Sequence, residues 1–382
     1  MNDDSFIQLR SVRTSVYRAP IETPVQTSFG LMRDRPMVLV EVTDADGHTG
    51  WGEVWCNFPE PGAEHRARLV DRILAPLACG TEGYADPPSL YDKLTRRTEV
   101  LALQSGEPGP FAHAIAGIDI AVWDLMARRR KLPLWRMLGG SSDRVPVYAS
   151  GINPTAPERT VERCRAEGHR RFKLKIGFDP QRDRANLAAL RDLLGSEAPL
   201  MVDANQAWTL AQASQIAPTL QDFDLCWLEE PLRADRPWAE WLELQRHCAI
   251  PLAGGENIAG DAAFDAALAA GALAVLQPDA AKWGGISALL PLARRIHAAG
   301  RRYCPHYLGG GVGLLASAHL LAATGGDGWL EIDSNPNPLR SLLCGALASI
   351  DDGHAALGEA PGLGLDVDRL ALADWRVPHD HG

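Results

Sequence analysis

The sequence lacks the features of several protein classes. It contains no run of eighteen apolar residues, so no membrane-spanning helix is expected. Its first ten residues, MNDDSFIQLR, carry acids and lack the apolar core of a signal peptide, so we expect a cytoplasmic protein. The net charge of −10 argues against nucleic acid as a partner, because phosphates attract a basic surface. The seven cysteines include no Cys-x-x-Cys pair, which favours reduced thiols over a disulfide or zinc framework.

What the chain does contain is enough for one large domain and a smaller one. It has 382 residues, of which 46% are apolar and 23% are charged. Over residues 1–135, strand patterns come first and helical patterns follow them, which predicts an α+β domain there. An Asp-Gly pair at Asp46-Gly47 favours a turn between two of its strands. The expected strands cover residues 10–17, 37–42 and 49–54, and the expected helices cover residues 63–77, 89–99 and 111–130.

From Val145 onwards, short apolar strands alternate with amphipathic helices, which is typical of βα units in a parallel sheet. Eight such strands favour a closed barrel, placed at residues 136–338, and residues 339–382 form a tail expected to fold back on the first domain. A glycine triplet, Gly309–Gly311, is expected to be a plain flexible loop rather than a phosphate cradle. The expected barrel strands cover residues 145–150, 172–176, 200–202, 225–229, 252–253, 275–277, 302–305 and 330–332.

Ionisable residues stand at, or just beyond, the end of seven successive predicted strands. Their separations are 28, 26, 27, 23, 27 and 25 residues, about one βα unit each. In a barrel these positions meet at one mouth, where barrel enzymes place their active sites. Buried carboxylates gathered there repel one another unless a cation or a proton holds them. The seven residues are Lys175, Asp203, Glu229, Glu256, Asp279, His306 and Glu331.

Three of these acids, Asp203, Glu229 and Glu256, come from adjacent strands and make an all-oxygen site that suits Mg²⁺. Beside them, Lys173 and Lys175 follow the strand period of two, so both amines point to the same side. A like charge and desolvation both lower a lysine pKa, so we expect Lys175 to act as a neutral amine base. The alternative is a pair of solvated surface lysines.

Asp279 and His306 lie on consecutive predicted strands. A carboxylate hydrogen-bonded to an imidazole fixes its tautomer and raises its basicity, which predicts a second acid/base group on another wall. Lys282 is a cation at the same rim, placed either to neutralise a substrate carboxylate or to serve as the second base. Glu331 is either a hydrogen-bond partner of that carboxylate or an ion-pair partner. His319 lacks such a position and is expected to be structural.

Motifs along the chain follow one another in a recognisable order. The first region carries Ala114-Ile-Ala-Gly-Ile-Asp-Ile-Ala-Val-Trp-Asp124 and Leu132-Pro-Leu-Trp-Arg-Met-Leu-Gly-Gly140. The barrel region carries Phe172-Lys-Leu-Lys-Ile-Gly177, Val202-Asp-Ala-Asn205, Trp227-Leu-Glu-Glu-Pro231, Gly254-Gly-Glu-Asn257, Gln277-Pro-Asp-Ala-Ala-Lys282 and Pro305-His306. Together, over nearly the whole chain, they resemble the enolase superfamily and, within it, the mandelate racemase subgroup (the mandelate racemase/muconate lactonizing enzyme family).

The resemblance implies an α/β fold: a modified TIM barrel of the (β/α)₇β form, with an N-terminal α+β capping domain completed by the C-terminal tail. It implies a Mg²⁺-dependent enzyme that abstracts the α-proton of a small-molecule carboxylate through a metal-stabilised enediolate. The residues that it assigns are Asp203, Glu229 and Glu256 for the metal, and Lys175, Lys173, the His306–Asp279 dyad and Glu331 for catalysis.

The resemblance also implies that cap loops at residues 21–35 and 54–61 choose the substrate. Arg33 and Asn57 of these loops, with Lys282 and Asn205 at the barrel rim, are the predicted substrate contacts. A homo-oligomer is expected, and neither nucleic acid nor a membrane is expected as a partner.

The reaction itself stays open at this stage. A hydroxy-acid or acid-sugar dehydratase comes first, and a racemase or epimerase of the same subgroup follows it closely. A cycloisomerase or dipeptide epimerase that pairs Lys175 with Lys282 is the second enzyme hypothesis, although the Asp279/His306 pair argues against it. A catalytically inactive metal-binding relative is the non-enzymatic alternative, and every catalytic position is filled by a competent residue type.

Overall fold

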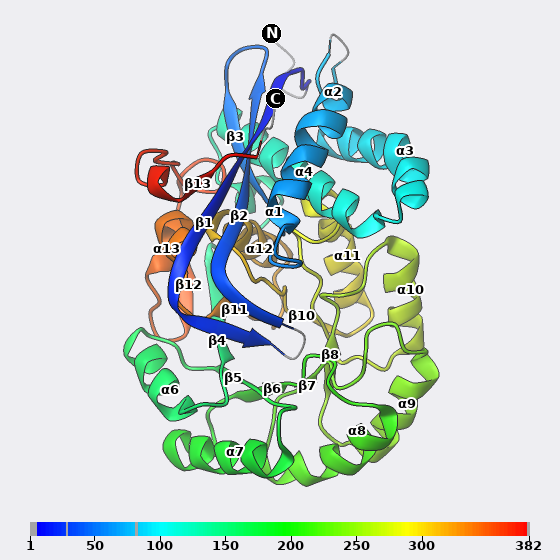
Figure 1. The fold of residues 1–382 in the computed structure, drawn as a ribbon, viewed down its shortest axis with the longest axis vertical. Helices are drawn as coiled ribbons and strands as arrows, with labels where there is room; N and C mark the ends of the chain where they lie inside the picture. The colour runs from blue at the N-terminus through cyan, green and yellow to red at the C-terminus, as the bar shows by residue number, and fades with distance from the viewer. Residues whose placement is uncertain (1–5, 28–29, 81–82, 380–382) are drawn as a thin grey trace.

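The computed structural model describes residues 6–27, 30–80 and 83–379, and it shows a capping domain packed on a barrel (Figure 1). Across these residues the barrel has eight parallel strands, with helices between successive strands, which makes seven βα units and a final strand. The strands pair in the order β10-β9-β8-β7-β6-β5-β4-β11, so the first barrel strand along the chain lies beside the last. The predicted modified TIM barrel is therefore confirmed.

Each barrel strand predicted from the sequence overlaps an observed one, although their ends differ by a few residues. The strands form over short apolar runs that are covered on both faces, and in β6 all four residues are buried. The strands are β4 (Arg144–Ile152), β5 (Phe172–Lys175), β6 (Leu200–Asp203), β7 (Leu228–Glu229), β8 (Leu252–Gly254), β9 (Val275–Leu276), β10 (Arg302–Tyr303) and β11 (Leu330–Asp333). The helices are α6 (Pro157–Ala166), α7 (Pro180–Leu194), α8 (Leu210–Ile216) with η2 (Ala217–Phe223), α9 (Trp238–His247), α10 (Asp261–Ala270), α11 (Gly285–Ala298) and α12 (Gly311–Thr324).

The register of the barrel strands brings charged side chains to one level. Lys175 of β5 pairs with Asp203 of β6, which in turn pairs with Glu229 of β7. Paired residues of parallel neighbours point to the same face of a sheet, so these three side chains all point into the barrel. The barrel interior also holds a compact cluster of apolar side chains, made by Tyr148, Met201, Trp227, Ala253, Val275 and Cys304.

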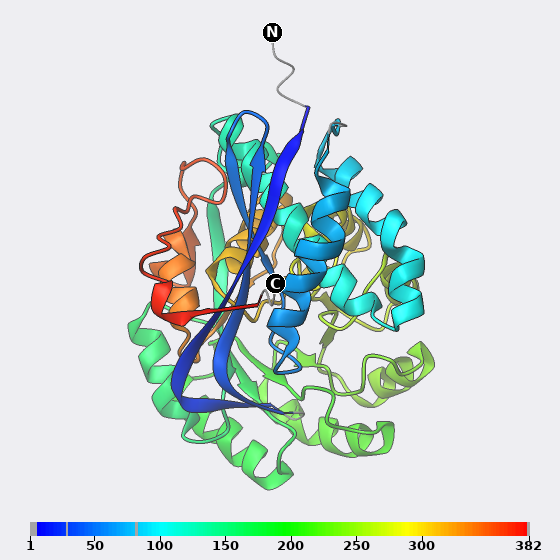
Figure 2. The ribbon, with the colours of Figure 1, turned by 45° about the horizontal axis from the view of Figure 1, so that its top comes forward.

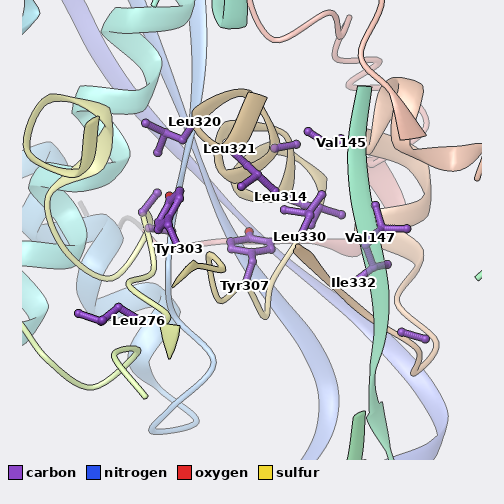
Figure 3. Close-up of a cluster of buried hydrophobic side chains, with 14 of the residues drawn as sticks. Val145, Val147, Leu276, Tyr303, Tyr307, Leu314, Leu320, Leu321, Leu330 and Ile332 are labelled. Carbon is purple, nitrogen blue, oxygen red and sulfur yellow. The ribbon is translucent and has the colours of Figure 1, made fainter. Parts of the chain in front are cut away.

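Helix α12 is buried along most of its length, with twelve residues in the core. Figure 3 shows Leu314 and Leu321 of this helix beside Leu330 of β11, with Tyr307 close to them. All four side chains are at most 3% exposed. The helix therefore packs as part of the core behind His306, which lies just before Tyr307 in the chain.

The capping domain contributes three strands to a four-stranded antiparallel sheet, which is completed by a strand of the C-terminal tail and covered by helices. One apolar core lies within this domain, and the core of the barrel also takes in cap residues such as Tyr17, Met37 and Leu39. Helix α4 has the length and apolar composition of a membrane span, but 78% of its most apolar stretch is buried inside the structure, where it serves as a core helix. The elements are β1 (Leu9–Thr27), β2 (Gly30–Asp44), β3 (Thr49–Val54), α1 (Gly62–Leu69), η1 (Val70–Leu74), α2 (Ala75–Ala78), α3 (Pro87–Ser105), α4 (Pro108–Arg129) and α5 (Leu134–Met137).

Strands β1 and β2 form one long hairpin that reaches towards the barrel (Figure 1). Much of the segment 21–35, which was expected to be a loop, is paired strand, with Val25 opposite Met32 and Thr27 opposite Gly30. The pairing shifts register between Pro20 and Val25, where prolines interrupt the alternation on which the shorter predicted strand was based.

The C-terminal tail contacts both domains. Its strand β12 (His354–Ala356) pairs with β4 of the barrel, and β13 (Arg376–Val377) pairs with β1 of the cap (Figure 2). The rest of the tail forms α13 (Pro338–Leu343), η3 (Gly345–Ala348) and η4 (Ala373–Trp375). All seven cysteines are free thiols, as the sequence predicted.

Two carboxylates of the capping domain cap helices of the barrel. Asp119, in α4, accepts hydrogen bonds from the backbone N–H groups of Ile286 (2.7 Å) and Ser287 (3.0 Å) in the first turn of α11. Glu53, in β3, accepts from two backbone N–H groups at the start of α12, at 2.5 and 3.0 Å. A Cβ atom at Gly310 would lie 2.8 Å from a Glu53 oxygen. The glycine triplet therefore allows this close approach, which the expectation of a plain flexible loop missed.

Replacing Asp119 with Ala should lower the free energy of unfolding by about 2–4 kcal/mol, because two buried backbone N–H groups and the hydroxyl of Ser287 lose their acceptor. The matched control is Asp86→Ala, which removes an exposed cap within α3 and should cost about 1 kcal/mol. Urea unfolding followed by circular dichroism measures both losses. Equal losses would contradict the interdomain role of Asp119.

Candidate active site

A cavity of about 290 Å³ opens at the carboxyl ends of the barrel strands. The cap contributes Val25, Trp55 and Phe58 to its wall, and amide side chains such as Asn153 and Asn335 make much of the rest. The charged residues that line it are Lys175, Glu256, Lys282, His306, Glu331 and Asp333. The mouth of the barrel therefore gathers the ionisable residues that the sequence spacing had placed there.

Two lysines of β5 contact the acids at the barrel mouth. Nζ of Lys173 is fully buried and lies 2.5 Å from Oε1 of Glu229, 2.8 Å from Oε1 of Glu331 and 3.7 Å from Oδ2 of Asp203. Nζ of Lys175 donates to Oδ2 of Asp203 at 2.5 Å and reaches the cavity. Both amines point into the barrel, as the strand period predicted, and neither is a solvated surface lysine.

Among the protein groups alone, the balance of charges raises the pKa of Lys175 above its ordinary value. Burial lowers this pKa, Asp203 raises it and Lys173 lowers it again, and the attraction of Asp203 and Glu229 outweighs the rest. Burial and the like charge of Lys173 act as the sequence predicted, and the carboxylate of Asp203 2.5 Å away acts against them. A divalent cation on these carboxylates opposes their field at the amine.

His306 forms the predicted pair with Asp279. Its Nδ1 lies 2.7 Å from Oδ2 of Asp279, and the other oxygen of Asp279 accepts from the backbone N–H of Ala281 at 2.8 Å. Nε2 of His306 lies 3.0 Å from Oε2 of Glu256. Burial lowers the pKa of His306, but Glu256 and Glu331 raise it to well above the usual range. Asp279 thus orients the imidazole, and Nε2 is directed at the acids.

Lys282 is a further cation at this rim. Its Nζ donates to Oδ1 of Asn257 at 2.8 Å and lies 3.4 Å from Oε2 of Glu256. The ammonium also stands 4.8 Å from the centroid of the Trp55 ring, a cation–π distance. A residue of the capping domain therefore helps to hold Lys282 beside the acids.

The acids at the barrel mouth have the chemistry of a Mg²⁺ site. Asp203 and Glu229 are buried, and Glu256 borders the cavity. Oε2 of a fourth acid, Glu230, is buried without a hydrogen-bond partner, and burial together with Glu256 and Asp203 raises the pKa of Glu230 well above its usual range. Within the described residues, the ligand oxygens of the three predicted acids do not all lie within 4.8 Å of one another, and the two lysines contact Asp203 and Glu229. Carboxylates in such surroundings fit a bound cation, which relieves their burial and mutual repulsion.

Two predicted substrate contacts line the cavity and two do not. Asn205 and Lys282 line it. Arg33 is exposed and lines a neighbouring hollow together with Asn57, whose Nδ2 donates to the backbone oxygen of Leu308 at 2.5 Å. The structure thus gives Asn57 a role in joining the cap to the barrel.

Asp333 and Asn335 also line the cavity wall and were not predicted from the sequence. Asp333 stands two residues beyond Glu331, so the strand period that pairs Lys173 with Lys175 also predicts that it faces inwards. Nδ2 of Asn335 donates to Oδ1 of Asp333 at 2.7 Å, beyond the end of β11, where no periodicity applies. Only the first of these two residues carried a signal in the sequence.

His319 does not line the cavity and is a core histidine, whose Nδ1 accepts from the backbone N–H of Trp135 at 2.9 Å. Burial lowers its pKa from 6.5 to about 4. The unfolded chain therefore takes up the proton first, so stability is complete above about pH 6.5 and falls by about 3 kcal/mol towards pH 4. Urea unfolding of His319→Gln should show a shallower loss between pH 7 and 5 than the unaltered chain. Parallel pH dependences would contradict this role.

Residues 10–139 match the family described as mandelate racemase/muconate lactonizing enzyme, N-terminal domain, and residues 157–371 match the enolase C-terminal domain-like family. The chain belongs to the mandelate racemase/muconate lactonizing enzyme family. This membership confirms the resemblance carried by its motifs, and it agrees with the capped barrel and the acids at its mouth.

Relatives of this enolase-superfamily member support an enzyme. The 3,6-anhydro-alpha-L-galactonate cycloisomerase of Streptomyces coelicolor is 33% identical over 95% of this chain and 98% of its own. Arabinonate dehydratase of Saccharolobus solfataricus is 28% identical over 88% and 90%. A solved mandelate racemase/muconate lactonizing enzyme from Bordetella bronchiseptica is 58% identical, with a TM-score of 0.92 over 97% and 99% of the chains. A racemase structure from Streptomyces coelicolor, 30% identical with a TM-score of 0.87 over 97% and 100%, holds magnesium. The chain is thus a lyase or an isomerase that uses Mg²⁺.

Proposed function

We propose that this enolase-superfamily member is an acid-sugar dehydratase, which removes the proton next to a substrate carboxylate and eliminates water to give a 2-keto acid. The proposal rests on one observation: two proton-transfer groups, Lys175 at the end of β5 and His306 after β10, line a single polar cavity. Two barrel strands separate β5 from β10 on one side and four on the other, so the two groups approach a bound molecule from different directions.

Charge placement supports this chemistry. When held by Asp203, Glu229 and Glu256, Mg²⁺ would supply positive charge beside the substrate carboxylate, where negative charge grows during proton removal. Lys282 adds a second cation at the same rim, and Glu331 borders the same space. These charges act most strongly on the species formed after proton transfer, which is the stabilisation that catalysis needs.

The reaction is a proton transfer followed by an elimination. Whichever of Lys175 and His306 faces the α-hydrogen takes it as a proton, and the C–H electron pair moves into the carboxylate as an enediolate. That pair then forms the C2–C3 double bond as the C3–O bond breaks, and the hydroxyl leaves as water with a proton from an acid on the enzyme. The resulting enol takes up a proton at C3 and becomes the 2-keto acid.

The cavity wall supports a hydroxylated substrate. Amide side chains, among them Asn153, Asn205, Gln206 and Asn335, offer both donors and acceptors to hydroxyl groups. A volume of about 290 Å³ suits a small molecule. Arabinonate and anhydro-galactonate, which appear in the names of two relatives, are sugar acids of this kind.

Cycloisomerisation is the second candidate, favoured by the 33% identity to a cycloisomerase and by Lys282 at the cavity wall. In that reaction Lys282 rather than His306 would be the second base. Lys282→Met and His306→Asn separate the two cases, because only loss of the true second base stops α-proton exchange on one face.

A panel of sugar acids incubated with the enzyme and Mg²⁺ in deuterated water tests the proposal. We expect a 2-keto acid from at least one member, detected as its semicarbazone and by mass spectrometry. Exchange or inversion at C2 without any keto acid would remove dehydration and leave racemisation. A cyclic isomer without loss of water would favour the cycloisomerase.

A further inference from the structure

We infer that the substrate carries one carboxylate and an uncharged, hydroxylated far end, so that it is an aldonic rather than an aldaric acid. The inference rests on the proposed function, because it names the substrate class of that same cavity. It follows from where the charged side chains of the cavity wall lie.

Within the described residues, every cation that lines the cavity contacts one of the acids at the barrel mouth. Lys175 contacts Asp203, and both Lys282 and His306 contact Glu256. These contacts place the positive charge beside Asp203 and Glu256, the acids that would hold Mg²⁺, so the substrate carboxylate would bind at that end. Within the described residues, the hairpin of β1 and β2 contributes the apolar side chain of Val25 to the cavity wall.

The opposite wall is made by the ends of β4 and β11, which lie across the barrel from β7 and β8. It carries Glu331, which contacts Lys173 at 2.8 Å, and, two residues further along β11, Asp333 with the amides of Asn153 and Asn335. Nδ2 of Asn153 donates to Oδ1 of Asn335 at 2.9 Å, and Nδ2 of Asn335 donates to Asp333 and to the backbone oxygen of Gly151. A Cβ atom at Gly151 would lie 2.5 Å from Oδ1 of Asp333, so the glycine lets this network close.

The charged side chains that border the cavity on this wall are carboxylates, those of Glu331 and Asp333. Asp333 lines the cavity, whereas its partner Arg35 does not. Arg35 is 1% exposed, and its guanidinium is directed at Asp333 and at Sδ of Met32. The second partner of Asp333, Arg340, lines a neighbouring hollow that shares Asp333 and Asn335 with the cavity.

A second carboxylate on the substrate would therefore lie beside Asp333 without a cation of its own. A buried charge without a partner is strongly disfavoured. A terminal hydroxyl is favoured at the same place, because it can donate to a carboxylate oxygen and accept from an amide. The wall thus selects against diacids by repulsion as well as for alcohols by hydrogen bonding.

The test compares matched pairs of six-carbon aldonic and aldaric acids with the unaltered enzyme and Mg²⁺. We expect aldonates to raise the melting temperature and to exchange their α-hydrogen, with a kcat/KM for exchange about 100-fold above that of the aldarates. Equal or better binding and exchange of the aldarates would overturn the inference, as would the absence of binding by every aldonate. Exchange of aldonates without keto acid would defeat dehydration and leave the substrate class intact.

Asp333→Asn provides a second measurement, since it removes the negative charge and leaves Arg35 as the nearest charge behind the wall. We expect the ratio of aldarate to aldonate exchange to rise at least tenfold. The matched control is Asp352→Asn, which breaks an exposed pair with Arg170 and should leave the ratio unchanged. An unchanged ratio in folded Asp333→Asn would overturn the assignment of selectivity to Asp333. If that variant does not fold, the matched pairs with the unaltered enzyme decide the inference.

Discussion

His306→Asn should lower kcat/KM by about 10²–10⁴-fold and stop exchange of the α-proton on one face of the substrate, while exchange on the other face continues. Lys175→Met should stop exchange of the α-proton on the opposite face of the substrate, while exchange on the first face continues. The physical reason is that the two groups reach the cavity from different walls, His306 held by Asp279 and Lys175 by Asp203. Proton NMR of each C2 epimer in deuterated water measures exchange on the two faces separately.

The matched control for His306 is His247→Asn. His247 lies on the surface of α9 and also pairs with a carboxylate, that of Glu243, at 3.0 Å. It should keep full activity. If both His306→Asn and Lys175→Met abolished exchange on both faces, the groups would act on one proton in sequence, and the two-sided arrangement would be wrong.

Removal of Mg²⁺ with a chelator should reduce turnover by about 10³-fold or more, and added Mg²⁺ should restore it. Without the cation, proton removal adds negative charge to a space already bordered by Glu256 and Glu331. Steady-state rates against free Mg²⁺ concentration give the half-saturating level. Asp203→Asn should raise that level at least tenfold, because it removes one anionic oxygen from the proposed ligands.

A metal control comes from the turn between β2 and β3. In the described part of the chain, Asp44, Asp46 and His48 form the group whose ligand atoms lie within 4.8 Å of one another. Oδ1 of Asp44 already accepts hydrogen bonds from the backbone N–H groups of Asp46 and His48, at 3.0 and 2.8 Å. Asp46→Asn should therefore leave the Mg²⁺ dependence unchanged. A shift in that variant and none in Asp203→Asn would place the metal at the turn.

Periodicity accounts for what the sequence predicted well. The βα spacing located all eight barrel strands and brought Lys175, Asp203, Glu229 and His306 to one mouth. It succeeded because parallel strands in register oblige residues at corresponding positions to share a level and a face. The same rule, carried two residues past Glu331, would have found Asp333.

Periodicity fails where the backbone leaves the strand. Asn205, Gln206 and Glu230 follow their strands with positive φ values of 44°, 64° and 40°, so their side chains no longer alternate between two faces. The unpartnered carboxylate oxygen of Glu230 and the place of Gln206 in the cavity wall arise from these turns. Contacts between domains, such as Glu53 at the start of α12, join residues more than 250 positions apart and leave no local pattern.

The two carboxylates that cap α11 and α12 also restrict how a molecule enters. If the domains parted, Asp119 and Glu53 would be drawn away from the first turns of helices that directly follow the segments of Lys282 and His306. Separation of the domains would thus dismantle the catalytic wall each time it admitted a molecule. The short segment that carries Trp55 and Asn57 is likewise tied to the barrel, through Lys282 and the backbone oxygen of Leu308, so the cap and the catalytic wall hold each other in place.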